Sequence, residues 1–334
     1  MPQASLIIVN YNGREYIIDC LRALEGQLFK EFEIILIDNG SSDGSLDKIR
    51  NYSEETPLAS VIRFIALDKN LGFAGGASEG LKHAHGEYIA LLNSDTEPDK
   101  KWLEELVMNM DNDPEVGICA SKLVVHGTDI IDSAGDGFST ALRGFKRDEG
   151  KRNLSCKERD YIFGACAGAA LYKRKMIEEI GFLDEDFFLI HEDTDLNLRA
   201  QLHGWKVLFV PTAIVYHKVR SSIGKMSPMA VYYTLRNSEF VRIKNIPLSL
   251  FLRCLPAFIL GMVSEFIFFV IKHRHLPIYF KAKIDAMRML PVMLKKRKMN
   301  LRGAKVDSKD LRKIMTPVFE RSFLRNKLKK LVYG

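Results

Sequence analysis

The sequence predicts an α/β fold built on a doubly wound, mostly parallel sheet. Short apolar runs alternate with segments of helical periodicity along the first half of the chain, and each run ends at a polar residue or a turn. Alternation at this spacing is typical of parallel strands joined by crossover helices. The 334 residues suffice for one large domain plus an appendage, or for two domains.

Four apolar runs are the expected strands of the first half, at residues 4–10, 32–40, 61–67 and 87–93. A helix follows the first run, and its apolar face is expected to contain Ile17, Cys20, Leu21, Leu24 and Leu28. The turn "SSDGS" leads into a short second helix, "GGASEGLKHAHG" is a third that Gly86 closes, and residues 100–110 form a fourth with Pro98 near its first turn.

The second half gives a less regular pattern. Residues 121–160 are polar and predict an irregular insertion over the sheet, and 164–175 predict a small-residue strand that runs into a basic turn. Residues 194–203 predict a helix that Gly204 stops. Within it, Asp195 and Arg199 are four residues apart and are expected to pair. Of Leu196 and Leu198, the spacing predicts one buried and one peripheral side chain.

Polar residues stand at or just past the ends of the predicted strands: Asn10, Asp38, Asn70 and Asp95. Any one of them is explained as an ordinary polar strand end. Ligands of doubly wound sheets bind beyond the carboxyl ends of the strands, so four such residues at one edge favour a ligand site.

Six acidic residues fall within twelve positions, at Asp184, Glu185, Asp186, Glu192, Asp193 and Asp195. Acids at the start of a helix are favoured by its dipole, which accounts for the last three. The dipole does not explain the two aromatic residues, Phe187 and Phe188, that precede them. A carboxylate beside apolar walls has a raised pKa, which suits a general base.

Seven motifs occur in a fixed order: "SLIIVNYN", "IDNGSSDGS", "NLGFAGG", "LLNSDTEP", "GFLDEDFFLIHEDTDLNLR", "GWKVLFVPTAIVYH" and "YYTLRNSEFV". Together they resemble the inverting glycosyltransferases of family 2, with the nucleotide-sugar GT-A fold, and most of all the rhamnosyltransferase-like branch. The resemblance covers about residues 4–243.

The resemblance implies roles for individual residues. Asp193 takes the place of the catalytic base. Asp95 takes the place of the metal-binding acid in a D-x-D motif that reads N-x-D here because Asn93 occupies its first position, and His217 matches a histidine that completes the metal shell in some relatives. The implied donor-binding residues are Val9, Asn10, Tyr11, Asp38, Asn70, Gly72, Gly75, Ser94 and Asp95; Gly168, Glu192 and Trp205 are assigned to the sugars.

The implied reaction is a metal-dependent, inverting transfer of a hexosyl group from a UDP- or dTDP-sugar, dTDP-rhamnose among them. The acceptor is a hydroxyl of a glycan or lipid-linked molecule in cell-surface polysaccharide synthesis. Mn²⁺ or Mg²⁺ suits a site in which phosphates supply several ligands. His217 also reads as an ordinary strand-end histidine and Trp205 as a core tryptophan, and His191 stands where the resembled pattern more usually has an aromatic residue.

Two other functions fit parts of the sequence. A nucleotidyltransferase shares the sheet type but would carry a glycine-rich basic loop after the first strand, and "NYNGREY" holds one glycine and one arginine. An inactive GT-A-like scaffold that binds nucleotide or glycan is the non-enzymatic alternative. The presence of both Asp95 and Asp193 counts against it.

The charge of the chain is divided unevenly. From Lys244 to the end there are 21 Lys and Arg against 5 Asp and Glu, a net charge of +16, whereas the first 243 residues hold 28 against 37, a net charge of −9. The basic part shows no nucleic-acid-binding motif and few interleaved aromatics, so an anionic membrane surface is the expected partner and nucleic acid is not. Five scattered cysteines and an N-terminus without a basic leader favour a reducing compartment.

The expected organisation is a catalytic domain at residues 1–225 and a helical, basic region at 226–334. An apolar segment at 246–271 is long enough to span a bilayer. Both of its flanks are basic and favour the cytoplasmic side, so we expect an in-plane or re-entrant arrangement at the cytoplasmic face of the membrane, peripheral or monotopic. A true span and a buried core helix remain the alternatives.

Overall fold

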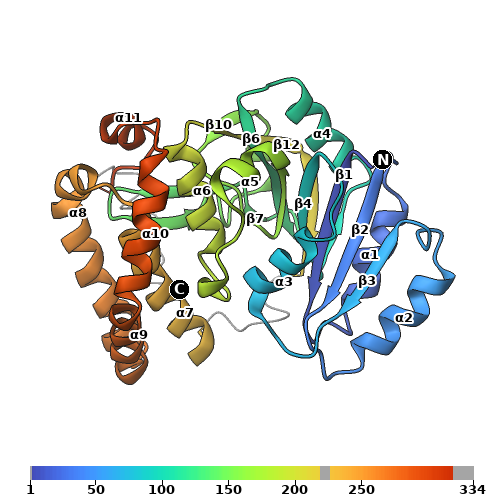
Figure 1. Cartoon of the computed structure of the whole chain (residues 1–334), viewed down its shortest axis with the longest axis horizontal. Coiled ribbons are helices and arrows are strands. Elements are labelled where there is room, and N and C mark those ends of the chain that lie inside the picture. Colours follow the sequence, from blue (N-terminus) through green and yellow to red (C-terminus); the bar gives the residue numbers. More distant parts are fainter. Residues whose placement is uncertain (1, 219–225, 319–334) are drawn as a thin grey trace.

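The computed structural model describes residues 2–218 and 226–318 (Figure 1). It is a mixed α/β structure with a central sheet flanked by helices, which confirms the predicted fold class. The expected boundary at residue 225 falls at the end of 219–225, outside the described residues. The strands are β1 (Ala4–Asn10), β2 (Phe32–Asp38), β3 (Ile62–Ala66), β4 (Tyr88–Asn93), β5 (Thr96–Pro98), β6 (Val116–Val125), β7 (Ile131–Ser133), β8 (Asp136–Ser139), β9 (Arg143–Lys146), β10 (Asp160–Ile162), β11 (Ala169–Lys173) and β12 (Lys206–His217).

The main sheet runs in the order β10-β12-β6-β11-β4-β1-β2-β3, with β5 paired to β12 and β7 to β6. Strands β4, β1, β2 and β3 are parallel, as expected, and β12 is parallel to β6. Strands β5, β7, β10 and β11 join the sheet antiparallel, which the sequence pattern did not predict. From β1 the chain continues to β2 on one side of the β4–β1 pair, and from β4 it continues toward β6 on the other side. A crevice for a ligand is therefore expected at the carboxyl ends of β1 and β4.

The helices are α1 (Ile17–Glu25), α2 (Ser45–Glu55), α3 (Gly72–Leu81), α4 (Trp102–Asp111), α5 (Arg174–Ile180), α6 (Glu192–Leu202), α7 (Pro228–Asn245), α8 (Leu248–Phe266), α9 (Leu276–Arg288), α10 (Leu290–Arg302) and α11 (Ser308–Lys313). Short 3₁₀ turns lie at Asn153–Ser155 and Glu185–Phe187, and a π-helical stretch, Ile267–Lys272, continues α8. Figure 1 shows α8 to α11 at the side of the molecule opposite α2 and β3.

Both faces of β1, β2 and β4 are buried because their side chains alternate between two cores. Leu6 and Ile8 of β1 pack with α1 and α4 on one face. Ile7 and Val9 pack with α3, α5 and α6 on the other. Helix α3 approaches β1 closely, since a Cβ on its Gly76 would lie 2.7 Å from the Val9 side chain. The glycine-rich composition of this helix therefore serves packing.

Several expectations about single elements were wrong. Leu28 lies beyond the end of α1 and is exposed, α3 ends at Leu81 well before Gly86, and Pro98 belongs to β5. The predicted irregular segment 121–160 begins with half of β6, a central strand, and the basic turn near 174 is the start of α5. Leu196 and Leu198 are both fully buried, because α6 lies between the sheet and the C-terminal helices.

Candidate active site

The register of the sheet brings the predicted strand-end residues to one edge. Asn10 pairs with Asp38 across β1 and β2, and Val9 pairs with Asn93 across β1 and β4. The Asn10 Nδ2 donates to Asp38 Oδ1 at 3.0 Å and to Ser45 Oγ at 3.0 Å. Asn10 Oδ1 is buried without a hydrogen-bond partner among the described residues. An unsatisfied buried acceptor at a strand end is expected where a ligand supplies the missing donor.

Tyr11 and Asp38 differ in exposure at this edge. Tyr11 is 44% exposed directly after β1, whereas Asp38 is buried, and its Oδ2 accepts from the Ser41 backbone N–H at 3.1 Å. Asp38 is therefore held in a fixed orientation by two neighbours. A nucleotide base at this edge would meet an exposed aromatic ring beside a fixed carboxylate.

The Asn70 side chain is engaged within the protein. Its Oδ1 accepts from the Gly72 N–H at 2.7 Å and from Asn39 Nδ2 at 3.0 Å. Asn70 thus shapes the turn before α3 through its Oδ1 atom, and its expected contact with the donor stays a prediction. Gly72 has φ of 74° and lies against Phe188, while Gly75 is buried and a Cβ on it would lie 2.7 Å from Leu71 Cβ, so both glycines permit close packing.

Asp95 and His217 come together although 122 positions separate them. Strand β5 pairs with the end of β12, so that Thr96 lies opposite His217. This register places His217 Nε2 3.5 Å from Asp95 Oδ1. Ser94 and Asp95 are both mostly buried. The juxtaposition agrees with the shared metal role that the sequence resemblance implied for Asp95 and His217.

Two further residues in this cluster were missed from the sequence. Asp132 Oδ2 lies 2.9 Å from His217 Nδ1, and Lys146 Nζ lies 2.8 Å from both oxygens of Asp132. Burial disfavours the charged form of His217, but its bonds to Asp132 and Asp95 outweigh burial and raise its pKa to about 9. Both missed residues lie in the segment expected to be irregular, which offered no periodic signal.

The cluster fits a divalent cation that takes most of its ligands from elsewhere. No group of three His, Cys, Asp or Glu side chains among residues 2–218 and 226–318 is arranged to hold a metal alone. Asp132 pairs with Lys146, so Asp95 and the deprotonated form of His217 are the candidate protein ligands. A carboxylate such as that of Asp95 suits Mn²⁺ and Mg²⁺ when phosphate oxygens and water complete the shell.

Asp193 lies in the first turn of α6, next to the loop before β11. The Ala167 N–H donates to its Oδ2 at 3.4 Å and the Thr194 N–H to its Oδ1 at 2.6 Å. Gly168 O accepts from the Asn93 N–H at 2.9 Å, so this loop joins Asp193 to the strand that leads to Asp95. Burial raises the pKa of Asp193, although these N–H donors and Lys146 oppose the rise.

Asp193 belongs to a group of three interacting acids. Burial and the nearby Asp193 charge raise the pKa of Glu192 and of Asp136 well above their usual range. The Glu192 Oε2 atom is buried with no hydrogen-bond partner among the described residues. Asp136 stands at the start of β8 and was not identified from the sequence, because no spacing rule links it to α6.

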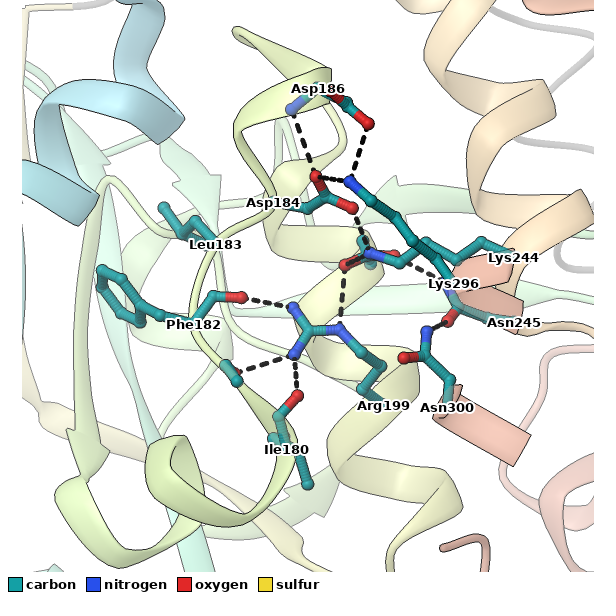
Figure 2. A network of polar contacts seen from close by, with 12 residues as sticks. Ile180, Phe182, Leu183, Asp184, Asp186, Arg199, Lys244, Asn245, Lys296 and Asn300 are labelled. Carbon is teal, nitrogen blue, oxygen red and sulfur yellow. Dashed lines mark hydrogen bonds and ion pairs between the residues drawn. The ribbon is translucent and has the colours of Figure 1, made fainter. Parts of the chain in front are cut away.

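Asp195 points into a different environment from Asp193. Its carboxylate accepts from Arg199 Nε at 2.9 Å, Lys244 Nζ at 2.8 Å and Asn245 Nδ2 at 2.7 Å. Figure 2 labels these three partners, together with Asp184 and Lys296. Lys244 and Lys296 also bind Asp184, at 2.7 and 2.5 Å. The expected Asp195–Arg199 pair is confirmed, and two lysines of the basic C-terminal part form internal ion pairs.

Trp205 lies away from the other predicted site residues. It precedes Lys206, which pairs with Val116 at the beginning of β6, whereas His217 pairs with Val125 at the end of that strand. The Trp205 Nε1 donates to Glu179 at 3.0 Å, and its ring packs against the core. The structure places Trp205 beyond the end of α6 at Leu202, whereas Asp193 lies at its start, so the expected contact of Trp205 with a sugar stays a prediction.

The sequence comparison gives the family directly. The profile of glycosyl transferase family 2 matches residues 5–181, more than half of the chain. The chain belongs to glycosyl transferase family 2. Membership makes it a glycosyltransferase by class, which confirms the coarser part of the sequence interpretation, while the rhamnosyltransferase-like branch stays a prediction.

The poly-β-1,6-N-acetyl-D-glucosamine synthases of Staphylococcus aureus (strain COL) and Staphylococcus epidermidis are similar in sequence. They are 23% and 24% identical over 225 residues, which is 66% of this chain and 51% of each synthase. The chain thus spans about half the length of the curated relatives it matches.

Solved structures share the fold. TarS 1–349 of S. aureus in complex with UDP-GlcNAc superposes with a TM-score of 0.56 at 18% identity and covers 90% of each chain. GalNAc-T7 with UDP, GalNAc and Mn²⁺ gives 0.60 at 19% identity, over 73% of this chain and 48% of that one. Mannosyltransferase PcManGT from Pyrobaculum calidifontis, with GDP-Man and Mn²⁺, gives 0.52 at 16% identity, over 100% and 81%.

Proposed function

We propose that the protein transfers a sugar from a nucleoside diphosphate donor to a hydroxyl group of a glycan or lipid-linked acceptor, with inversion and with Mn²⁺ or Mg²⁺. The observation that carries the proposal is the contact between Asp95 and His217 at the same sheet edge as Asn10 and Asp38. UDP-sugars and dTDP-sugars, dTDP-rhamnose included, are the proposed donors. The relatives named for GlcNAc polymers and for UDP-GlcNAc binding add UDP-GlcNAc as a donor to test.

Each residue of the candidate site has a separate proposed role in the reaction. Tyr11 and Asp38 would receive the base, and the turn held by Asn70 would lie beside the diphosphate. Asp193 would take the proton from the attacking hydroxyl, for which a raised pKa is suited. A divalent cation held by Asp95 and His217 would neutralise charge on the leaving diphosphate.

A donor panel tests this proposal. UDP-GlcNAc, UDP-GalNAc, GDP-mannose and dTDP-rhamnose are each incubated with the full chain, with Mn²⁺ or with EDTA, and both hydrolysis and thermal shift are recorded. We expect one donor to be hydrolysed only with Mn²⁺, and Asp95→Ala to reduce that hydrolysis at least about 100-fold, as for other transition-state charge contacts. Hydrolysis that is equal in EDTA, or unaffected by Asp95→Ala, contradicts the metal role.

We further propose that 226–334 seats the catalytic domain, 1–225, on the cytoplasmic face of an anionic membrane. One helix, Leu248–Lys272, is long and apolar enough to cross a bilayer. Its Leu250, Cys254, Ala257 and Glu265 pack on the protein, and Glu265 pairs with Arg143. The opposite face exposes apolar side chains, at Leu248, Leu252, Ile259, Leu260, Val263, Phe266, Ile267 and Ile271. A helix covered on one side and apolar on the other suits insertion in the membrane plane.

Exposed apolar and basic side chains also occur on α9 and α10. Phe280, Ile284 and Met287 of α9 are exposed, and so are the basic Lys295 and Lys298 of α10. Exposed apolar side chains with basic neighbours match an anionic bilayer, to which each cation near the surface adds about 1 kcal/mol.

Vesicle binding tests the surface. The variant Leu252→Ser/Ile259→Ser/Val263→Ser should lose most of its binding to vesicles of phosphatidylglycerol and phosphatidylcholine. The matched control Leu28→Ser/Met108→Ser/Leu154→Ser changes apolar residues that are about as exposed but lie outside the C-terminal helices. Equal binding by the two triple variants contradicts the membrane role of α8.

A further inference from the structure

The backbone just before α6 is held in an unfavourable conformation. Phe188, Ile190 and His191 have φ values of 65°, 67° and 72°, although none of them is glycine. Residues with a Cβ rarely adopt this region, and each such residue costs on the order of 1–3 kcal/mol unless its surroundings impose it. Helix α6 starts at Glu192, so this strained segment, residues 187–191, sets where Asp193 begins its turn.

The strained segment is held by one buried side chain of α7. Asn237 is fully buried, and its Nδ2 lies within hydrogen-bonding distance of three carbonyl oxygens: Phe187 O at 2.9 Å, Leu189 O at 2.8 Å and Ile190 O at 2.7 Å. These carbonyls converge only because the chain turns back on itself at the positive-φ residues. The Asn237 amide thus stabilises the turn.

Arg236 fixes the orientation of that amide. Its Nε donates to Asn237 Oδ1 at 2.9 Å, and this directs the Asn237 Nδ2 toward the carbonyls. The second guanidinium nitrogen donates to Asp186 O at 2.7 Å and to Phe187 O at 3.0 Å. A buried side chain whose donors and acceptor are all used is a rigid support.

The same segment contacts the donor side of the site. Phe188 O accepts from the Ala74 N–H at 3.1 Å, at the start of α3, and the Phe188 ring stacks on Tyr233 with centroids 5.2 Å apart. The segment therefore connects α3, next to the Asn70 turn, with α6. Helix α7 contacts it through Asn237.

We infer that Asn237 is a positioning residue: through its bonds to the carbonyls of 187–191 it keeps Asp193 where it can accept a proton. The inference rests on the proposed function, because it takes Asp193 as the base. Asn237 touches neither substrate nor Asp193 in this role. Its loss should lower the rate of the chemical step and leave donor binding nearly unchanged.

Two substitutions test Asn237. Asn237→Asp keeps the shape but replaces the donating amide with an acceptor that faces three carbonyl oxygens, and we expect kcat for donor hydrolysis to fall at least about 30-fold with the donor KM changed less than about threefold. Asn237→Ser introduces no buried charge and serves the same test if Asn237→Asp does not fold. Asn109→Asp is the control, because Asn109 is also buried and donates to a carbonyl, Glu105 O, within α4.

Two readouts separate positioning from simple destabilisation. In the Asp193→Asn background, the Asn237 substitutions should lower the residual rate less than about threefold, because effects on one catalytic unit do not add. Hydrogen exchange in peptides that cover 183–191 should be faster in the Asn237 variants and unchanged in Asn109→Asp.

The outcomes are distinct. A wild-type rate for Asp193→Asn overturns the proposed base, and the positioning role falls with it. A slow Asp193→Asn together with a normal kcat in the Asn237 variants overturns only the positioning role. An equal loss from the Asn237 change in both backgrounds also overturns it, since Asn237 then acts independently of Asp193.

Discussion

Two carboxylates in the first turn of α6 meet opposite environments. Asp195 is surrounded by Arg199, Lys244 and Asn245, and despite full burial its pKa is lowered. Asp193, two residues earlier, accepts only backbone N–H and Thr194 hydroxyl bonds among the described residues, and its pKa is raised. The position of nearby cations, and not membership of an acidic run, therefore separates the ion-paired acid from the proposed base.

Helix geometry explains why Asp193 and Asp195 have different neighbours. Residues two apart on an α-helix point about 200° from each other, so one side chain faces the loop before β11 and the other faces α7. Lys244 of α7 binds Asp195 and Asp184, and Lys296 of α10 binds Asp184 (Figure 2).

The largest expected effect comes from replacing Asp193, the proposed base. Asp193→Asn should lower the rate of donor turnover about 100- to 10,000-fold, the range for a general base, without loss of folding stability, because it removes a carboxylate held without a cation. Steady-state kinetics and urea unfolding measure the two effects. The acidic limb of the wild-type pH–rate profile should lie above the usual Asp value of 3.8, since burial raises the pKa of Asp193. A normal rate would remove the distinction between the two acids.

The next largest effect is expected at Asp195, the acid of the pair that binds cations. Lys244→Met leaves Asp195 and Asp184 with one cation fewer in a buried site and should lower the free energy of unfolding by about 3–5 kcal/mol. Lys281→Met is the matched control, because the Lys281 side chain is 67% exposed and its pair with Asp285 should contribute little to stability. Equal losses in urea unfolding would contradict the special position of Lys244.

The smallest expected effect is a pH dependence in the same network. Burial raises the pKa of Asp184, but Lys244 and Lys296 outweigh it and lower the pKa to about 2, from 3.8 when unfolded. A depressed pKa stabilises the fold above pH 3.8, and this contribution is lost as pH falls toward 2. The loss amounts to about 2 kcal/mol.

Urea unfolding of wild type and Asp184→Asn between pH 6 and pH 2 measures the contribution of the Asp184 carboxylate to stability. The stability difference between them should shrink by about that amount as the solution is acidified. A constant difference would show that Asp184 is not stabilised by its lysines.

The sequence predicted the framework well because its signals were local. The predicted strand runs at 4–10 and 32–40 depend on periodicity, and the structure has strands at 4–10 and 32–38. The pair Asp195–Arg199 depends on a spacing of four along one helix, which a short segment specifies by itself. Strand β6 was missed where polar residues interrupt the apolar pattern, and β11 was expected as a strand but not as an antiparallel one.

The site was predictable only in part. The convergence of Asn10, Asp38 and Asp95 followed from the rule for parallel strands, but Asp132, Lys146 and Asp136 come from a segment with no regular pattern. The sequence also did not reveal that Trp205 lies beyond the end of α6 opposite to Asp193, because nearness in sequence to a helix does not show which end faces the other site residues.

The sequence by itself determined the alternating fold, the family and the divided charge, because composition, periodicity and motif order are properties of the chain. The tertiary structure decided which acids are paired, that Lys244 and Lys296 bind inside the protein, and that α8 turns its apolar face outward. The physical reason is that a charge or an apolar side chain acts through its neighbours, and residues more than a hundred positions apart become neighbours only when the chain folds.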